Sequence, residues 1–358
     1  MNTWTRWLPA VIVPALIAGV AIVAPLQASA TQDLPAKTPQ QVLALVAGSQ
    51  VHAFSGTVEQ SAELGLPELP AAGQRQDSPA ASILELLTGS HTARVYVDGP
   101  TKARIQVMDQ LAERDVIRNG SELWLYSSDD NSTVHATLPA KDATRSAPQH
   151  EAPTPATLGE KILDALDSST EVTLGDDTSV AGRTAYNLVL TPRTTATLVR
   201  SVSIAVDSET GLPLRVQVIA RGQEKPAFQL GFTKLSLAAP SAKLFTFTPP
   251  SGSSVKEQKL PAWTESSTKP KKDLAQTPGS QQQSPLVIGT GWSAIVELPA
   301  GALPKQVTSS PLLAQATTSV AEGKLLHTSL LNVLFTNDGR VFAGSVPAAQ
   351  LQAAAGQR

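Results

Sequence analysis

The segment Val202–Val218, VSIAVDSETGLPLRVQV, decides the fold class. Val202, Ile204 and Val206 alternate with small or polar residues, and the same alternation resumes at Leu214. Side chains of a strand point alternately to its two faces, so each run predicts a strand with one apolar face. The Thr-Gly-Leu-Pro turn between the runs is too short for a crossover helix. The segment therefore predicts two antiparallel, neighbouring strands.

The same pattern recurs on both sides of this hairpin. Alternation predicts strands near residues 102–107, 186–190 and 228–232, and at Phe245–Phe247. Asn119-Gly120 predicts a tight hairpin, because both residues tolerate a positive φ. No helix between successive strands is long enough to connect parallel partners. We therefore predict a mainly β protein, in which a curved, mainly antiparallel sheet of about ten strands forms an incomplete, half-closed barrel.

Two segments predict short helices that cover this sheet. Thr38 and Pro39 supply an N-cap and a first-turn proline, and Gly48 ends the first helix. The second helix is expected over about Ala156–Asp167. It places four aliphatic residues on one face, namely Leu158, Ile162, Leu163 and Leu166. An apolar sheet face with such thin cover either fills with side chains or leaves a cavity for an apolar ligand.

The composition excludes several classes of function. The chain has 358 residues, with 28 Lys and Arg against 30 Asp and Glu, and a formal net charge of −2. This balance argues against a nucleic-acid partner, which usually requires a basic excess. The absence of cysteine excludes disulfides, thiolate metal sites and cysteine nucleophiles.

The first thirty residues have the features of a secretion signal. Arg6 precedes the uncharged, mostly apolar run Leu8–Leu26, and Ala28-Ser29-Ala30 is a small-residue cleavage pattern. The apolar run is long for a signal and near the lower limit for spanning a bilayer. Residues 1–30 are therefore either removed or kept as an N-terminal anchor. Both alternatives predict an exported protein, located in the cell envelope or secreted.

Shifts in composition divide the remaining chain. Residues 63–80 and 139–155 look irregular because they are rich in proline. Residues 251–284, rich in Ser, Gln, Pro and Lys, predict a flexible linker. We therefore predict a main domain over residues 31–250 and a small C-terminal α+β module over residues 285–358. A module of this size is marginal alone and is expected to dock on the main domain.

The sequence contains no pattern typical of a catalytic, metal or cofactor site. Its five histidines have no partner at metal-ligand spacing, and it has no nucleophile elbow or Walker loop. Gly289–Ala294, GTGWSA, only loosely mimics a dinucleotide-binding loop, because no helix or parallel unit follows it. Asp129–Asn131 is better explained as a solvated hairpin tip than as a calcium site. We predict a protein that is not an enzyme and has no cofactor.

Five segments together resemble the bacterial lipoprotein-carrier superfamily that contains LolA and the sigma-E regulator RseB. They are FSGTVEQ at 54–60, NGSELWLY at 119–126, VAGRTAYNL at 180–188, DSETGLPLR at 207–215 and FTFTPP at 245–250. Their order and spacing make the resemblance specific. The segments VIRNG at 116–120 and TNDGRV at 336–341 are most similar to the actinobacterial branch, which often carries such a C-terminal extension.

The resemblance implies a half-barrel with helices as a lid over an apolar cavity, and acyl chains as ligands. The apolar and aromatic residues of the predicted strands are the candidates to line this cavity: Phe54, Val95, Val97, Ile105, Val107, Trp124, Tyr126, Tyr186, Leu188, Val202, Ile204, Val216, Val218, Phe228 and Phe232. For each of them, a place in an ordinary filled core is the alternative, because the pattern does not distinguish the inner face from the outer one.

Two functions compete. The first is an extracytoplasmic carrier that binds a lipid or the acyl chain of a lipoprotein, since burial contributes about 0.8 kcal/mol per methylene. The alternative is an RseB-like envelope-stress regulator that binds a membrane protein such as an anti-sigma factor. The predicted linker and C-terminal module favour the alternative, because carriers of this fold usually need only one domain.

Overall fold

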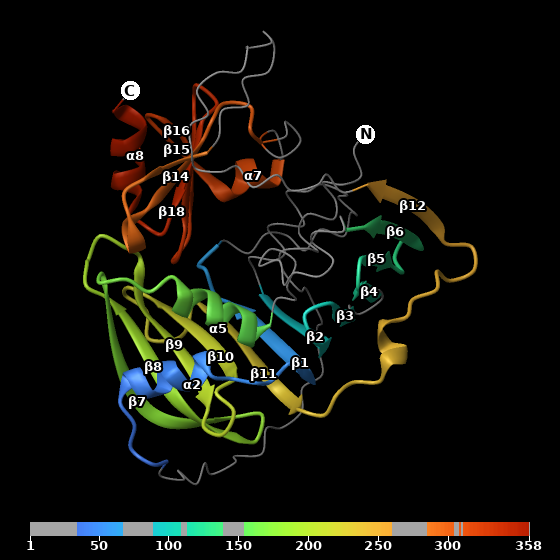
Figure 1. The fold of residues 1–358 in the computed structure, drawn as a ribbon. Coiled ribbons are helices and arrows are strands. Elements are labelled where there is room, and N and C mark those ends of the chain that lie inside the picture. The colour runs from blue at the N-terminus through green and yellow to red at the C-terminus, as the bar shows by residue number, and fades with distance from the viewer. Residues whose placement is uncertain are drawn as a thin grey trace, which may run out of the picture.

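The structure is a computed structural model that describes residues 34–66, 89–108, 113–138, 154–259, 285–303, 308 and 311–357. The predicted secretion signal lies outside the described residues, as do most of the two proline-rich segments and residues 260–284 of the predicted linker. The described chain forms two β-sheets and a few short helices (Figure 1).

The larger sheet has twelve strands in the described part of the chain, in the order β12-β6-β5-β4-β3-β2-β1-β11-β10-β9-β8-β7. The strands are β1 (Ala53–Ala62), β2 (Gly89–Asp98), β3 (Lys102–Met108), β4 (Glu113–Asn119), β5 (Glu122–Ser127), β6 (Ser132–Thr137), β7 (Thr170–Val180), β8 (Arg183–Pro192), β9 (Val199–Asp207), β10 (Pro213–Ala220), β11 (Phe228–Ser236) and β12 (Ser254–Lys259). Figure 1 shows that the sheet curves, so that β3–β6 and β12 turn away from the plane of β7–β11.

The mainly β, mainly antiparallel prediction is confirmed, with two corrections. The sheet is mixed, because β12 runs parallel to β6, and β12 lies inside the segment predicted as a linker. The strand predicted at Phe245–Phe247 is wrong: Phe245 ends a 3-10 turn, η2 (Ala242–Phe245), and residues 246–247 belong to no strand. Phe245 is almost fully buried and Phe247 packs on the rings of Trp124 and Tyr126, so side-chain packing holds this segment instead of a strand ladder.

The two predicted helices are present and lie on the same side of the sheet (Figure 1). They are α2 (Pro39–Ala47) and α5 (Pro155–Asp164). Each begins with a capping box, formed by Thr38 with Gln41 and by Thr154 with Thr157. These pairs satisfy backbone N–H groups that have no partner inside the helix, which fixes where each helix starts.

The C-terminal module is a six-stranded antiparallel sheet in the described residues, in the order β13-β14-β18-β17-β16-β15. Its elements are β13 (Leu286–Ile288), η3 (Gly291–Ser293), β14 (Ile295–Leu298), α7 (Pro311–Ala316), β15 (Thr317–Val320), β16 (Gly323–His327), β17 (Asn332–Thr336), β18 (Val341–Gly344) and α8 (Ala348–Gly356). Leu351 and Ala355 of α8 pack on Leu334 and Phe342 of the sheet, which gives the module its own core.

Residues 242–259, which we call the strap, cross β3–β6 on the side of the sheet that carries Trp124 and Tyr126, and end as β12. The guanidinium of Arg104 forms an ion pair with Asp115, with 2.5 Å between Nη2 and Oδ2, and donates a hydrogen bond to the carbonyl of Leu244. At the far end, Ser253 shares a 2.7 Å hydrogen bond with Thr133 of β6. The strap therefore covers the edge of the sheet that β6 would otherwise expose.

His135 of β6 links the strap to the sheet. Its Nδ1 lies 2.9 Å from Glu257 of β12 and its Nε2 lies 2.5 Å from Glu122, while the imidazole stacks on Trp124. Burial alone would lower the pKa of His135. The hydrogen bonds and charges of Glu257 and Glu122 outweigh burial and raise the pKa above its ordinary value of 6.5.

We expect this link to weaken with rising pH. The ion pairs of protonated His135 stabilise the folded state fully below pH 6.5, the ordinary pKa of histidine. This stabilisation is lost as the pH rises through the raised pKa that His135 has in the folded protein. Because both carboxylates are partly exposed, the free energy of unfolding should lose about 0.5–1 kcal/mol between pH 6 and pH 9 relative to the His135→Gln variant. Urea unfolding of both proteins at each pH measures the difference. An equal difference at the two pH values would contradict the link.

Candidate binding face

Thirteen of the fifteen candidate residues share one face of the large sheet. Residues paired across neighbouring strands point to the same side, so the register can be followed from strand to strand. Leu188 pairs with Ile204, Ile204 with Val216, and Val216 with Leu230. Across β1, Phe54 pairs with Val97, and in β2 and β3 Val95 pairs with Ile105. We call this side of the sheet the inner face.

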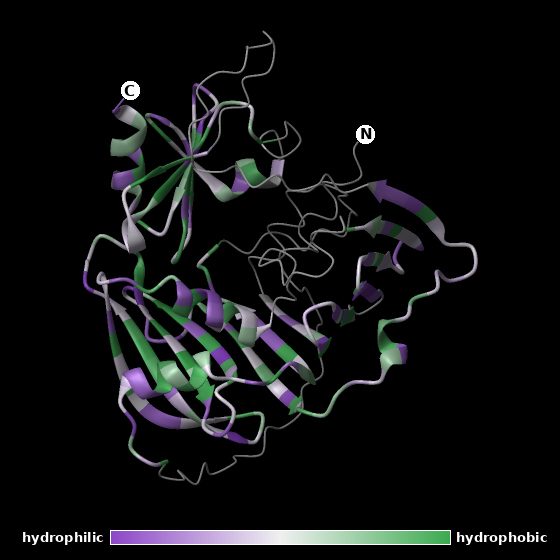
Figure 2. Ribbon diagram, viewed as in Figure 1, coloured by the Kyte–Doolittle hydropathy of each residue, from purple (hydrophilic) through white to green (hydrophobic). Residues whose placement is uncertain are grey.

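The inner-face candidates are mostly buried. Ten of them are classed as core residues, namely Phe54, Val95, Ile105, Val107, Tyr186, Leu188, Val202, Ile204, Val216 and Phe232, while Val97, Val218 and Phe228 are half-buried. They divide into two apolar clusters, one around Phe54 and Phe232 and one around Leu188 and Ile204. Figure 2 shows hydrophobic residues along the strands beneath α2 and α5. Acyl-chain lining by these residues stays a prediction.

The helices α2 and α5 cover the inner face over β7–β11. Val42 and Val46 of α2 belong to the cluster around Leu188. In α5, Gly159 stands so close to the sheet that a Cβ there would lie 2.7 Å from Pro213 and 3.4 Å from Ile204. The absence of a side chain at this position lets the helix approach the sheet closely.

Leu158 of α5 is a residue that the list of candidates missed. It packs against both apolar clusters and so connects the two halves of the inner face. The helical spacing of Leu158 with Ile162 and Leu166 was the available signal, because it marks the face that α5 turns to the sheet.

Among the inner-face candidates, Tyr186 also forms a hydrogen bond through its side chain. Its hydroxyl donates a 2.9 Å hydrogen bond to the carbonyl of Pro35, just before α2. Burial, with a smaller contribution from Asp177, raises the pKa of Tyr186, so the phenol stays protonated as a donor. Tyr186 therefore fixes the segment that leads into the covering helix.

Trp124 and Tyr126 lie on the opposite face of the sheet. They pair with His135 and Thr133, and Phe247 of the strap packs on both rings. In β5 the residues on the inner face are Leu123 and Leu125, which the candidate list omitted. The structure therefore separates these two aromatics from the other thirteen candidates.

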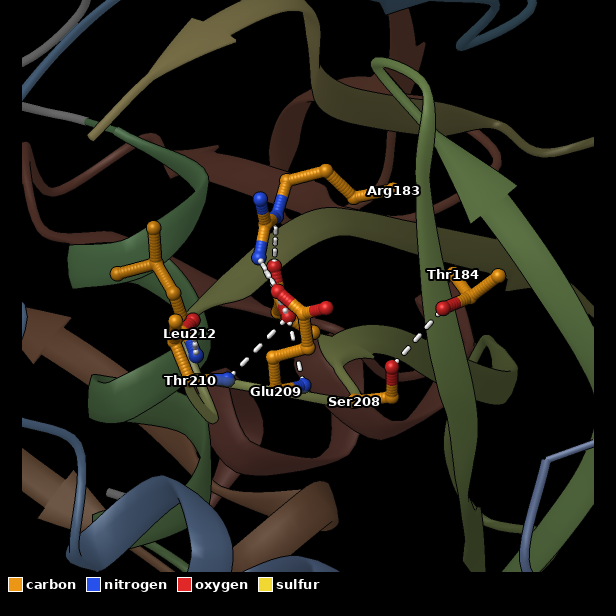
Figure 3. A network of polar contacts seen from close by, with 7 residues as sticks. Arg183, Thr184, Ser208, Glu209, Thr210 and Leu212 are labelled. Carbon is orange, nitrogen blue, oxygen red and sulfur yellow. Dashed lines mark hydrogen bonds and ion pairs between the residues drawn. The ribbon is translucent and has the colours of Figure 1, made fainter.

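The carboxylate of Asp207 holds the turn between β9 and β10. Figure 3 shows the polar network of this turn, in which Arg183, Glu209 and Thr210 take part. Asp207 is fully buried, pairs with the Arg183 guanidinium, and accepts hydrogen bonds from the backbone amides of Glu209 and Thr210. The hydrogen bond from Arg183 to Asp207 raises the pKa of the guanidinium. In the same turn, Gly211 contacts α2, so this network positions the turn on which that helix rests.

In the described residues, no group of three His, Cys, Asp or Glu side chains could hold a metal ion. No described helix is both long and apolar enough to cross a membrane.

Residues 85–262 match the family model described as "MucB/RseB N-terminal domain", and this segment belongs to that family. The match confirms the resemblance to RseB that the motifs predicted. It covers β2 to β12, and so includes the strap. No curated protein matches the chain.

Several solved structures are similar to this chain. MucB in complex with MucA(peri) is 17% identical, covering 88% of this chain and 97% of that chain, with a TM-score of 0.42. The MucA/MucB complex of Pseudomonas aeruginosa is 16% identical, covering 88% and 96%, with a TM-score of 0.41. A LolA superfamily protein from Nitrosomonas europaea is 12% identical, covering 59% and 99%, with a TM-score of 0.24.

Proposed function

We propose that this protein is an exported, non-catalytic regulator that binds the extracytoplasmic segment of a membrane protein of the anti-sigma factor class. The observation that carries the proposal is the family match over residues 85–262. MucB has been crystallised in complex with MucA, and we assign this chain a partner of the same class. The sequence alone favours the carrier function, whereas the family match favours the regulator.

The proposal includes the domain organisation expected from the sequence. Residues 31–250 form the half-barrel domain together with β12, the remainder of residues 251–284 connects this domain to the module, and residues 285–358 form the module. Residues 1–30 direct export and are either removed or kept as an anchor. The separate core of the module around Leu334 and Phe342 supports a unit that can make contacts of its own.

The test is direct binding to candidate partners. The extracytoplasmic segments of the anti-sigma factors of the source organism are titrated into the full chain by calorimetry. At least one segment should bind with a dissociation constant of about 1 μM or tighter. Failure of every segment to bind protein whose circular dichroism shows intact β structure would overturn the proposal.

A second candidate function is the binding of an acyl chain at the inner face. The shared face of the thirteen candidates favours it, because an apolar surface covered by only two short helices suits an apolar ligand. Native mass spectrometry of protein purified without detergent should then show a mass increment of a bound lipid. Protein without any increment, which also takes up no fatty-acyl probe, would exclude this candidate.

A further inference from the structure

The loop Gly289–Ala294 forms a contact between the C-terminal module and the large sheet. Trp292 of this loop packs on the apolar cluster around Leu188, which lies between the covering helices and β7–β10. Its indole Nε1 donates a 2.8 Å hydrogen bond to the hydroxyl of Thr170, the first residue of β7. The tryptophan therefore covers one end of the apolar layer beneath α2 and α5.

Leu330 makes a second apolar contact from the module. It packs against the cluster around Leu188 and also against a small cluster around Ala220 and Ala227. The neighbouring Ser329 amide donates a 2.9 Å hydrogen bond to the carbonyl of Leu64. This loop lies between β16 and β17, so the contact comes from a different part of the module.

Polar contacts also join the module to the large sheet. The Ser345 carbonyl accepts 2.8 Å hydrogen bonds from the Leu198 amide and from the Thr197 hydroxyl. Among the described residues, Trp292 and Leu330 are the module side chains that join the apolar clusters of the large sheet. Two domains typically move relative to each other when the interface between them buries few apolar side chains.

We propose that the C-terminal module is a hinged cover, which closes the end of the apolar layer with Trp292 and Leu330 and must lift before an acyl chain enters. The inference rests on the proposed acyl-binding role of the inner face and adds its regulation. The module has its own core, so it can lift as a unit without unfolding. Lifting breaks the indole hydrogen bond and exposes the cluster around Leu188, which is the entrance that an apolar ligand requires.

The position of the cover can be measured without a ligand. The chain has no cysteine, so Arg200→Cys and Ala353→Cys, both at exposed positions, provide clean sites for a pair of distance labels. Trp292→Ala should lengthen and broaden the distance distribution, and Leu330→Ala should do so independently. Trp292→Phe retains an aromatic ring without the N–H donor, and should give a smaller change. Distances that stay unchanged in both alanine variants would overturn the cover.

A reversible lock tests the gating step. A Cβ at Gly291 would lie 3.7 Å from the Cβ of Ser169, within the range of about 3.5–4.5 Å found in disulfides. The Ser169→Cys/Gly291→Cys double variant should therefore lock the module when oxidised and release it when reduced. Because Gly291 has φ +55°, the Ser169→Cys/Gly291→Ala variant is the control for backbone strain.

The readout is the apparent affinity for dansyl-undecanoic acid. If access depends on the lifted fraction, the oxidised lock should weaken the apparent affinity about tenfold or more, and Trp292→Ala should tighten it by a similar factor. Equal affinity of the oxidised and reduced lock would overturn the gating. Binding of an anti-sigma factor segment to both forms would leave the proposed regulator function intact, so the two failures are distinguishable.

Discussion

Replacing Gly211 by alanine is expected to lower the free energy of unfolding by about 3 kcal/mol. Gly211 has φ +76°, where a side chain costs about 1–2 kcal/mol. Its Cβ would lie 2.1 Å from the carbonyl oxygen of Leu45 in α2, so the helix must move away from the turn. Such overpacking adds about 1–3 kcal/mol. Urea unfolding measures the loss, and hydrogen exchange of the α2 amides shows whether the helix is displaced.

Gly182 provides the matched control for this variant. It has φ +78° in the turn between β7 and β8, but no atom lies within 4 Å of its Cβ position. Gly182→Ala should therefore cost only the backbone strain, about 1 kcal/mol, and leave the α2 amides protected. Equal losses for the two alanine variants would show that contact with Leu45 contributes nothing.

Asp207→Ala is the second substitution with a large expected effect. The carboxylate is buried, pairs with Arg183 and accepts the Glu209 and Thr210 amides, so its removal leaves a half-buried guanidinium and two amides without their acceptor. Breaking such a pair by removing one partner typically costs about 3–5 kcal/mol, and partial exposure of Arg183 places the expectation near the lower end. Thermal and urea unfolding check the loss.

Glu209→Gln is the control in the same network. Glu209 also pairs with Arg183, at 2.8 Å, but its side chain is 77% exposed. An exposed pair of this kind contributes little, so the change in the free energy of unfolding should stay within about 0.5 kcal/mol. A loss for Asp207→Ala no larger than that of Glu209→Gln would show that burial of the carboxylate does not matter here.

Local patterns in the sequence predict both covering helices, the hairpin of β4 and β5, and the strands β3, β8, β9, β10 and β11. Alternation in Val202–Val218 and the turn chemistry around Gly211 correspond to β9 and β10, and the cap at Thr38 corresponds to the start of α2. These signals are local, because strand period, turn residues and capping residues act within a few positions.

Long-range features escaped prediction. β12 lies in a polar stretch without a strand pattern, and it forms because β6 offers an unpaired edge. The sequence also could not show that Trp124 and Tyr126 lie on the opposite face from the other candidates. The alternation of side chains along β5 places Trp124 and Tyr126 on one side of the strand and Leu123 and Leu125 on the other. It does not show that the strap covers the side with the two aromatic residues. Contact of Leu158 with both clusters likewise depends on where α5 docks.

The parallel pairing of β12 with β6 affects where the polypeptide can be cut. A fragment ending at residue 250, the boundary that composition suggests, would lack Ser254–Lys259 and leave one row of β6 amides and carbonyls unpaired. The unpaired N–H and C=O groups of an exposed edge strand can form hydrogen bonds with a strand of another molecule. Such a fragment is expected to self-associate and precipitate, whereas a fragment that retains Lys259 keeps the row occupied.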